Sequence, residues 1–174
     1  MFRLLLTPTT NLLMYRHEPG GKILKINTRL FGELEYQEED LISFPDGLPS
    51  FENEHSFLIL PLAGSENSIF CLQSTVTPSL SFIMMDPCAL DPHYSPIVKG
   101  EDLKTLHVSS NLDLCYYVLC AMKRPASETT VNLKCPIALE PKAGLAFQVI
   151  LENENLSMHH MLSEFAHQKE GTTC

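Results

Sequence analysis

Hydrophobic residues along this chain come in short runs that are rich in Ile, Val, Phe and Tyr and are separated by Pro, Gly, Asn or Asp. Such runs are typical of strands, because β-branched and aromatic side chains favour an extended backbone and the separating residues favour turns. The pattern predicts nine strands, at Lys22–Thr28, Gly32–Tyr36, Phe57–Leu62, Phe70–Ser74, Leu80–Met85, Leu114–Met122, Thr129–Leu133, Ile137–Glu140 and Leu145–Leu151.

The connections between these runs favour antiparallel pairing. The regular alternation of strands with long helices that builds a parallel sheet is absent from the pattern. Residues 141–144, Pro-Lys-Ala-Gly, predict a hairpin turn in which Gly144 adopts a positive φ, so the last two strands should pair antiparallel. We expect a mainly β fold, an antiparallel barrel-like or sandwich domain with a few short helices.

Two segments show helical spacing. Glu101–Leu106 predicts a single helical turn, and the C-terminal region predicts a helix that Ser157 can cap. Four apolar residues follow that cap at positions i, i+3, i+4 and i+7, which places them along one helix face. We expect this stripe to dock on the chain's own sheet, with docking on a partner as the alternative. The stripe consists of Met158, Met161, Leu162 and Phe165.

Charge is concentrated in one part of the chain. The 174 residues carry 12 Lys and Arg against 21 Asp and Glu, a net charge of −9, and residues 33–54 hold eight acidic residues with no Lys or Arg. Binding to a nucleic-acid backbone needs clustered positive charge, so an acidic surface that meets a basic partner is the better prediction, with a plain solvated face as the alternative. The acidic residues are Glu33, Glu35, Glu38, Glu39, Asp40, Asp46, Glu52 and Glu54.

The cysteines and the N-terminus favour a cytoplasmic protein. Six cysteines occur without a Cys-x-x-Cys pair, in a chain long enough to fold without disulfides, so we expect reduced thiols. The apolar run Leu4–Leu6 is shorter than the core of a signal peptide, and no run approaches the ~20 apolar residues that span a bilayer. We therefore expect neither export nor membrane insertion.

Catalytic and cofactor motifs are scarce. The sequence contains no phosphate-binding glycine loop and no Gly-x-Ser-x-Gly nucleophile motif. An enzyme built on Cys88, Asp91 and His93 is one alternative, although a loop cysteine explains the same residues. A zinc site at His160, Glu164 and His167 is another, although a polar helix face explains that spacing. We predict a binding protein without metal or cofactor.

Several segments, read in order, resemble the flagellar assembly factor FliW family. The first are Thr28-Arg29-Leu30-Phe31-Gly32-Glu33-Leu34 and Asp40-Leu41-Ile42-Ser43-Phe44-Pro45-Asp46-Gly47-Leu48-Pro49-Ser50-Phe51-Glu52. They are followed by Phe57-Leu58-Ile59-Leu60-Pro61-Leu62, Leu72-Gln73-Ser74, Asp86-Pro87, Thr130-Val131-Asn132-Leu133-Lys134-Cys135-Pro136-Ile137 and Leu156-Ser157-Met158-His159. The resemblance spans about residues 26–159.

One departure from the family pattern bears on loop shape. Where the family tends to have Pro-Gly-Phe-Glu, this chain has Pro49-Ser50-Phe51-Glu52. Pro followed by Gly suits a type II turn, whereas Ser at the third turn position favours type I. The sequence therefore predicts a type I turn here.

The resemblance implies a small, mostly antiparallel β protein with a barrel-like core that is not an enzyme. It implies two alternative protein partners, flagellin and the basic translational repressor CsrA. Capture of CsrA would relieve repression of flagellin mRNA, and accumulated flagellin would release CsrA again. The acidic residues would steer CsrA toward the surface, and Leu48 and Phe51 would anchor it. The expected partner-binding residues are Glu33, Glu35, Glu38, Glu39, Asp40, Leu48, Pro49, Phe51 and Glu52.

The resemblance also divides the chain. We expect an N-terminal extension at 1–25, disordered or an upstream start-codon artefact at 1–13, then a single β domain at 26–168 and a frayed tail at 169–174. The free protein is expected to be monomeric and to bind neither nucleic acid nor membrane. The alternative function is a small-ligand carrier, because a β barrel can enclose an apolar cavity.

Overall fold

The computed structural model describes residues 21–65 and 68–169, and for residues 166–169 it describes the backbone only. The described part contains one α-helix, α1 (Gly100–Thr105), and a set of short strands and 3-10 helices. The strands are β1 (Leu24–Thr28), β2 (Gly32–Tyr36), β3 (Ile42–Ser43), β4 (Ser56–Pro61), β5 (Ile69–Ser74), β6 (Ser81–Met85), β7 (Cys115–Ala121), β8 (Thr130–Val131), β9 (Ile137–Glu140), β10 (Leu145–Gln148) and β11 (His160–Met161). None of the helices in these residues has the length and apolar composition that crossing a bilayer requires.

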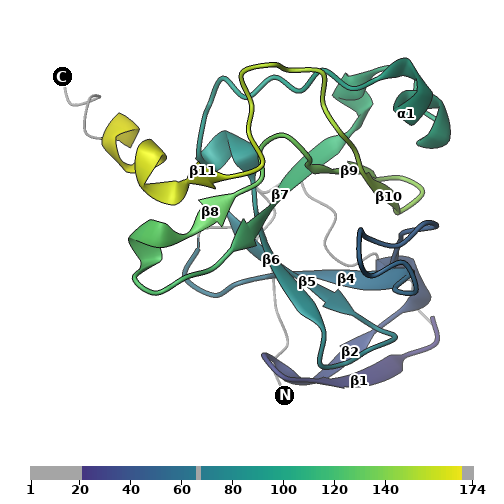
Figure 1. The fold of residues 1–174 in the computed structure, drawn as a ribbon. Coiled ribbons are helices and arrows are strands. Elements are labelled where there is room, and N and C mark those ends of the chain that lie inside the picture. The colour runs from purple at the N-terminus through teal and green to yellow at the C-terminus, as the bar shows by residue number, and fades with distance from the viewer. Residues whose placement is uncertain (1–20, 66–67, 170–174) are drawn as a thin grey trace.

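Seven strands close into a barrel. They pair in the order β7-β6-β5-β4-β3-β10-β9, and β9 pairs back with β7. Every pairing is antiparallel except the contact of β3 with β10, which runs parallel at Ser43 and Leu145. β8 and β11 extend the sheet beyond β7, on the left of Figure 1. The predicted mainly β, antiparallel barrel is confirmed.

Apolar side chains fill the barrel. Inward-facing residues of several strands form one buried cluster in which rings pack edge to face, as in Phe44 against Phe57 with ring centroids 5.0 Å apart, and Phe70 against Tyr117 at 5.2 Å. Each large apolar side chain that is fully buried contributes about 1.5–3 kcal/mol. A barrel filled in this way does not favour a ligand-holding cavity, and so does not favour the carrier alternative.

The β1–β2 hairpin packs on the outside of the barrel, at the bottom of Figure 1. Its strands alternate between an apolar face, with Ile26 opposite Leu34, and a charged face, with Lys25 opposite Glu35. Ile26 is 7% exposed and packs with barrel residues of β4 and β5. The period-two pattern therefore directs one face to the barrel and the acidic side chains to solvent.

Every predicted strand corresponds to an observed strand, with ends that differ by a few residues. The predicted helical turn is confirmed as α1, and the predicted positive φ is observed at Gly144, where φ is +64°. Two strands were not predicted, β3 and β11. Each has only two residues, too few to show a period in the sequence. β8 is as short, but it lies within the longer strand-like run Thr129–Leu133.

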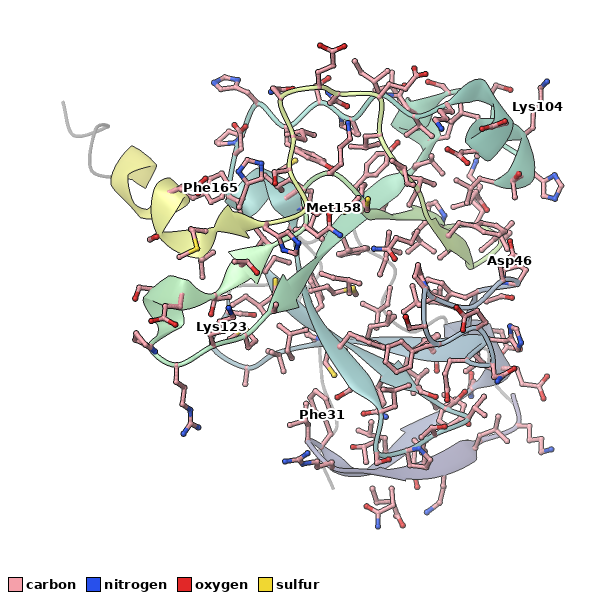
Figure 2. All side chains as sticks on the ribbon, viewed as in Figure 1. Phe31, Asp46, Lys104, Lys123, Met158 and Phe165 are labelled. Atoms are coloured by element: carbon pink, nitrogen blue, oxygen red, sulfur yellow. The ribbon has the colours of Figure 1, made fainter. Side chains whose placement is uncertain are left out.

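The predicted C-terminal helix is confirmed in part: a helix is present, but it is a 3-10 helix that begins later than a cap at Ser157 predicts. Residues after Ser157 form the short strand β11 and then a 3-10 helix, η5 (Leu162–Lys169). Leu162 and Phe165 pack on a second buried cluster, which includes Val118 of β7 and Val131 of β8, as expected of a stripe that docks on its own sheet. Met158, in contrast, is 46% exposed. Figure 2 shows Met158 and Phe165 on this C-terminal strap, residues 157–169. The backbone of Leu162 donates to the Thr129 carbonyl, a strand pairing that competes with an earlier helix start.

The folded part begins before residue 26, because β1 starts at Leu24. The expectations for 1–13 lie outside the described residues, as does the expected frayed tail 169–174 apart from its first residue, where η5 ends. The five described cysteines are free thiols.

Candidate protein-interaction surface

The acidic segment begins on β2, where Glu33 and Glu35 project into solvent. Lys25 on β1 lies between them, with Nζ 3.4 Å from a Glu33 carboxylate oxygen and 2.9 Å from one of Glu35. These two carboxylates, Glu35 first, raise the pKa of Lys25. Exposed pairs of this kind contribute little to stability, because solvent screens them, and they partly neutralise this end of the acidic segment.

The next three acidic residues form a single 3-10 turn, η1 (Glu38–Asp40). The Gln37 backbone N–H donates to the Asp40 carboxylate at 2.7 Å, which fixes the start of the turn. Glu38 and Glu39 are exposed, and no basic side chain of the described residues lies within ion-pair distance of either. Glu38 and Glu39 therefore supply charge that the described part of the chain does not neutralise.

Asp46 and Glu52 continue the acidic segment on the loop between β3 and β4, and both are exposed. Elements β2, η1, β3 and this loop follow one another along the chain, from the hairpin at the bottom of Figure 1 to the blue segment at its right. Figure 2 shows Asp46 at that side and Lys123 at the other. The Glu52 carboxylate accepts hydrogen bonds from two backbone N–H groups, its own and that of Ser50. These bonds lower the pKa of Glu52 and keep the carboxylate ionised.

Glu54 does not belong to this surface. It is 9% exposed, and its carboxylate accepts hydrogen bonds from the Ser74 hydroxyl and from the Thr77 hydroxyl, the latter at 2.5 Å. Those residues lie at the end of β5 and in the loop that follows it. Glu54 therefore joins the β3–β4 loop to the β5–β6 loop.

The turn at residues 48–51 is type II, so the type I prediction is wrong. Ser50 has φ +69°, and the proline ring fixes φ of Pro49 near about −65°. Leu48 and Phe51 form a bridge, with the Phe51 N–H donating to the Leu48 carbonyl at 2.7 Å. Gly47 also has positive φ, +67°, which lets the backbone of Phe51 pass close to it.

The two apolar residues of this turn face opposite ways, which corrects one expected anchor. Leu48 is 2% exposed and belongs to the barrel core, so it offers no surface to a partner. Phe51 is 37% exposed, and its ring packs edge to face on Phe82, with centroids 4.9 Å apart. Pro49 is exposed beside it. Of the two expected anchors, only Phe51 is accessible.

Sequence reasoning missed Val76. This residue is 59% exposed in the loop between β5 and β6. The sequence does show a β-branched apolar residue within the polar stretch Ser74-Thr75-Val76-Thr77-Pro78. A single such residue cannot be distinguished from the last residue of the preceding strand.

The geometry around Cys88 argues against a catalytic cysteine. Burial, with the nearby carboxylates of Asp86 and Asp91, raises the pKa of the Cys88 thiol, which disfavours the thiolate that nucleophilic attack requires. The Asp91 carboxylate accepts the backbone N–H of His93 at 2.8 Å, so it caps a turn. Cys88, Asp91 and His93 thus belong to a local turn, and the carboxylates of that turn disfavour the thiolate form of Cys88.

Both ring nitrogens of His160 form hydrogen bonds. The Ser157 backbone N–H can only donate, so Nε2 accepts it at 3.0 Å, and Nδ1 therefore carries the proton that it shares with Glu164 at 3.1 Å. Neither nitrogen offers a lone pair to a metal ion. The side chain of His167 lies outside the described residues. Within the described part of the chain, no group of three or more His, Cys, Asp or Glu residues could hold a metal ion.

Comparison with known proteins places this barrel in a family. A family model described as FliW protein matches residues 25–162. The chain belongs to the FliW family. A relative named flagellar assembly factor FliW from Geobacillus kaustophilus is 34% identical over 80% of this chain and 95% of its own length. A relative of the same name from Syntrophomonas wolfei is 34% identical over 86% of this chain and 95% of its length.

A solved FliW structure shares the fold. The crystal structure of a flagellar assembly factor FliW superposes with a TM-score of 0.72 at 34% identity, covering 79% of this chain and 96% of the other. The sequence resemblance to the FliW family is thus confirmed. The names of these relatives describe an assembly role, which fits a surface for protein contacts better than a catalytic centre.

Proposed function

We propose that this chain is a flagellar assembly factor that binds flagellin and, alternatively, CsrA, and that it relieves repression of flagellin mRNA by switching between them. It acts in the cytoplasm, without catalysis and without binding nucleic acid or membrane directly, and it is monomeric when free. The observation that carries the proposal is the family match over residues 25–162, combined with the exposed acidic surface of a FliW-type barrel.

The acidic surface suits a basic, RNA-binding partner on physical grounds. Glu38, Glu39, Asp46 and Glu52 are exposed on consecutive elements, and Glu38 and Glu39 have no ion-pair partner among the described residues. Charges of one sign speed the encounter with an oppositely charged surface, and near an RNA path they repel phosphate. Their effect falls on the association rate and weakens as salt rises.

A titration tests the partner switch. Purified protein is first saturated with CsrA from the same organism, and flagellin is then added while the CsrA complex is followed by native mass spectrometry. We expect flagellin to displace CsrA in proportion to its concentration. Simultaneous, independent binding of both partners would contradict the switch, and no binding of either would contradict the proposed function as a whole.

Charge reversal tests the role of the acidic surface. In the double variant Glu38→Lys and Glu39→Lys, we expect slower CsrA association with little change in dissociation, because exposed charges act mainly on encounter. The matched control is Glu152→Lys with Glu154→Lys, which makes the same change in net charge at two exposed positions of another segment. Equal association rates for the two variants would place the steering surface elsewhere.

A further inference from the structure

Two loops at the β4–β5–β6 part of the barrel each expose an apolar side chain. Phe51 on the β3–β4 loop is 37% exposed and Val76 on the β5–β6 loop is 59% exposed. Glu54 links these loops, since its backbone N–H donates to the Phe51 carbonyl at 3.0 Å while its carboxylate accepts the hydroxyls of Ser74 and Thr77. Glu54 therefore fixes the two loops, and with them Phe51 and Val76, relative to each other.

The β5–β6 loop is fixed from its own side as well. The Ser74 hydroxyl oxygen accepts the backbone N–H groups of Val76 at 3.0 Å and of Thr77 at 2.8 Å. The buried Gln73 amide donates to the carbonyls of Pro78 and Leu80, each at 3.0 Å. Because the loop is held at both ends, Val76 is presented in one position, and little entropy is lost when a partner contacts it.

Phe51 is held in the same manner. Its ring packs edge to face on Phe82 of β6, and its backbone forms the bridge with Leu48, whose side chain is buried in the core. An aromatic ring that is fixed by a neighbour and still partly exposed is the type of residue that dominates binding energy at protein interfaces. The two loops thus present a preformed apolar surface.

The charge of these loops defines the partner. Residues 44–55 and 75–80 contain no Lys or Arg, and their exposed charges are the carboxylates of Asp46 and Glu52. An apolar surface bordered by carboxylates complements a protein surface in which an apolar side chain stands beside Lys or Arg. It disfavours a phosphate backbone, which the same carboxylates would repel.

We propose that Phe51 and Val76, held together by Glu54, form the anchoring surface for the cationic protein partner of this chain. The proposal rests on the proposed function, because it assigns the contact that keeps CsrA bound after the acidic residues have steered it. Glu54 is a positioning residue in this arrangement, since its carboxylate is occupied by the two hydroxyls and does not face the partner.

Substitution of Val76 is the sharpest test. Val76→Ser removes exposed apolar surface and leaves the core intact, so the variant should fold as the wild type does. We expect its Kd for CsrA to rise by about tenfold, with the change in the dissociation rate, as for anchor residues in general. Phe51→Ala should act in the same direction, with a melting curve to confirm that loss of the Phe82 contact has not unfolded it.

The matched control is Leu112→Ser. Leu112 is 89% exposed on a different segment, η3 (Asn111–Asp113), so this variant removes a comparable apolar side chain away from the two loops. We expect its Kd to equal that of the wild type. If Val76→Ser and Leu112→Ser bind equally well, the anchoring surface is refuted while the proposed function stands. If the wild type does not bind CsrA, the proposed function itself fails.

The role of Glu54 needs a readout other than binding. In Glu54→Gln, one carboxylate oxygen that accepts a hydroxyl proton is replaced by an amide donor. We expect faster hydrogen exchange at the backbone N–H groups of Val76 and Thr77, together with weaker CsrA binding. Unchanged exchange with weaker binding would show that Glu54 does not act by positioning this loop.

Discussion

Replacing Ser50 by Gly should stabilise the protein. Ser50 holds φ +69°, a left-handed conformation that costs a residue with a Cβ about 1–2 kcal/mol. Glycine relieves this cost, but it loses more conformational entropy on folding, about 0.5–1 kcal/mol. The midpoints of these two ranges differ by about 0.75 kcal/mol, which is the expected gain in the free energy of unfolding. For a chain of this length, that gain raises Tm by about 1–4 °C.

The assay is urea unfolding at equilibrium, supported by a calorimetric Tm. Ser50→Ala is the matched control, because it removes the exposed hydroxyl and keeps the strained backbone. It should show no gain. The hydrogen bond from the Ser50 N–H to the Glu52 carboxylate, 2.8 Å, survives in both variants. If Ser50→Ala stabilises as much as Ser50→Gly, or neither does, the backbone-strain reasoning is wrong.

Four further outcomes follow from the packing and the charges. Gly47→Ala should cost more than about 2 kcal/mol of stability by urea unfolding, because a Cβ there would lie 2.6 Å from the Phe51 carbonyl oxygen at φ +67°. Leu48→Ala should cost about 2–5 kcal/mol, as expected for a core residue. Hydrogen bonding, first of all to His160, lowers the pKa of Glu164, so the ionised carboxylate stabilises the fold above its ordinary pKa and this stabilisation is lost as the pH falls. Glu164→Gln should therefore flatten the decline in the urea midpoint between about pH 5 and pH 3. The pKa of the Cys88 thiol is raised, so the rate of its alkylation, measured by mass spectrometry, should increase only at pH values above the ordinary thiol pKa.

Much of the fold could be predicted from the sequence because strand formation leaves a local pattern. Each strand of four or more residues has a run of apolar or alternating side chains, and the Pro-Lys-Ala-Gly turn before β10 has turn chemistry. Strands β3 and β11 leave no such pattern, because a two-residue pairing is decided by the neighbouring strand. The closure of β9 on β7 is likewise a tertiary contact between segments 20 or more residues apart.

The C-terminal strap shows how a correct spacing can mislead. The four apolar residues that begin at Met158 match a helix face, yet the backbone N–H of Leu162 bonds to the Thr129 carbonyl. An α-helix capped by Ser157 would direct that donor to the Met158 carbonyl instead, so the helix begins only at Leu162. Helix propensity is a weak preference, and tertiary hydrogen bonds outweigh it here.

The acidic surface was predictable in composition but not in detail. Eight clustered carboxylates indicate a charged face, whereas the burial of Glu54 has no local signal, because an isolated Glu is expected at the surface. Leu48 and Phe51 are both apolar loop residues, and only the type II turn determines which of them enters the core. That turn requires positive φ at Ser50, a conformation that the residue type itself disfavours.

The proposed partner switch would need both fast capture and stable retention, and the proposed contacts assign the two requirements to different side chains. Exposed carboxylates such as Glu38 and Glu39 can raise the encounter rate but contribute little to the lifetime of a complex, because solvent screens them. Phe51 can contribute to the lifetime because a partner would remove its exposed surface from water. Raising salt should therefore slow CsrA association without affecting dissociation, whereas loss of Phe51 should do the reverse. A competitor that covered only the carboxylates would slow capture and leave an existing complex in place, so displacement of bound CsrA by flagellin would require the apolar contact to be opened as well.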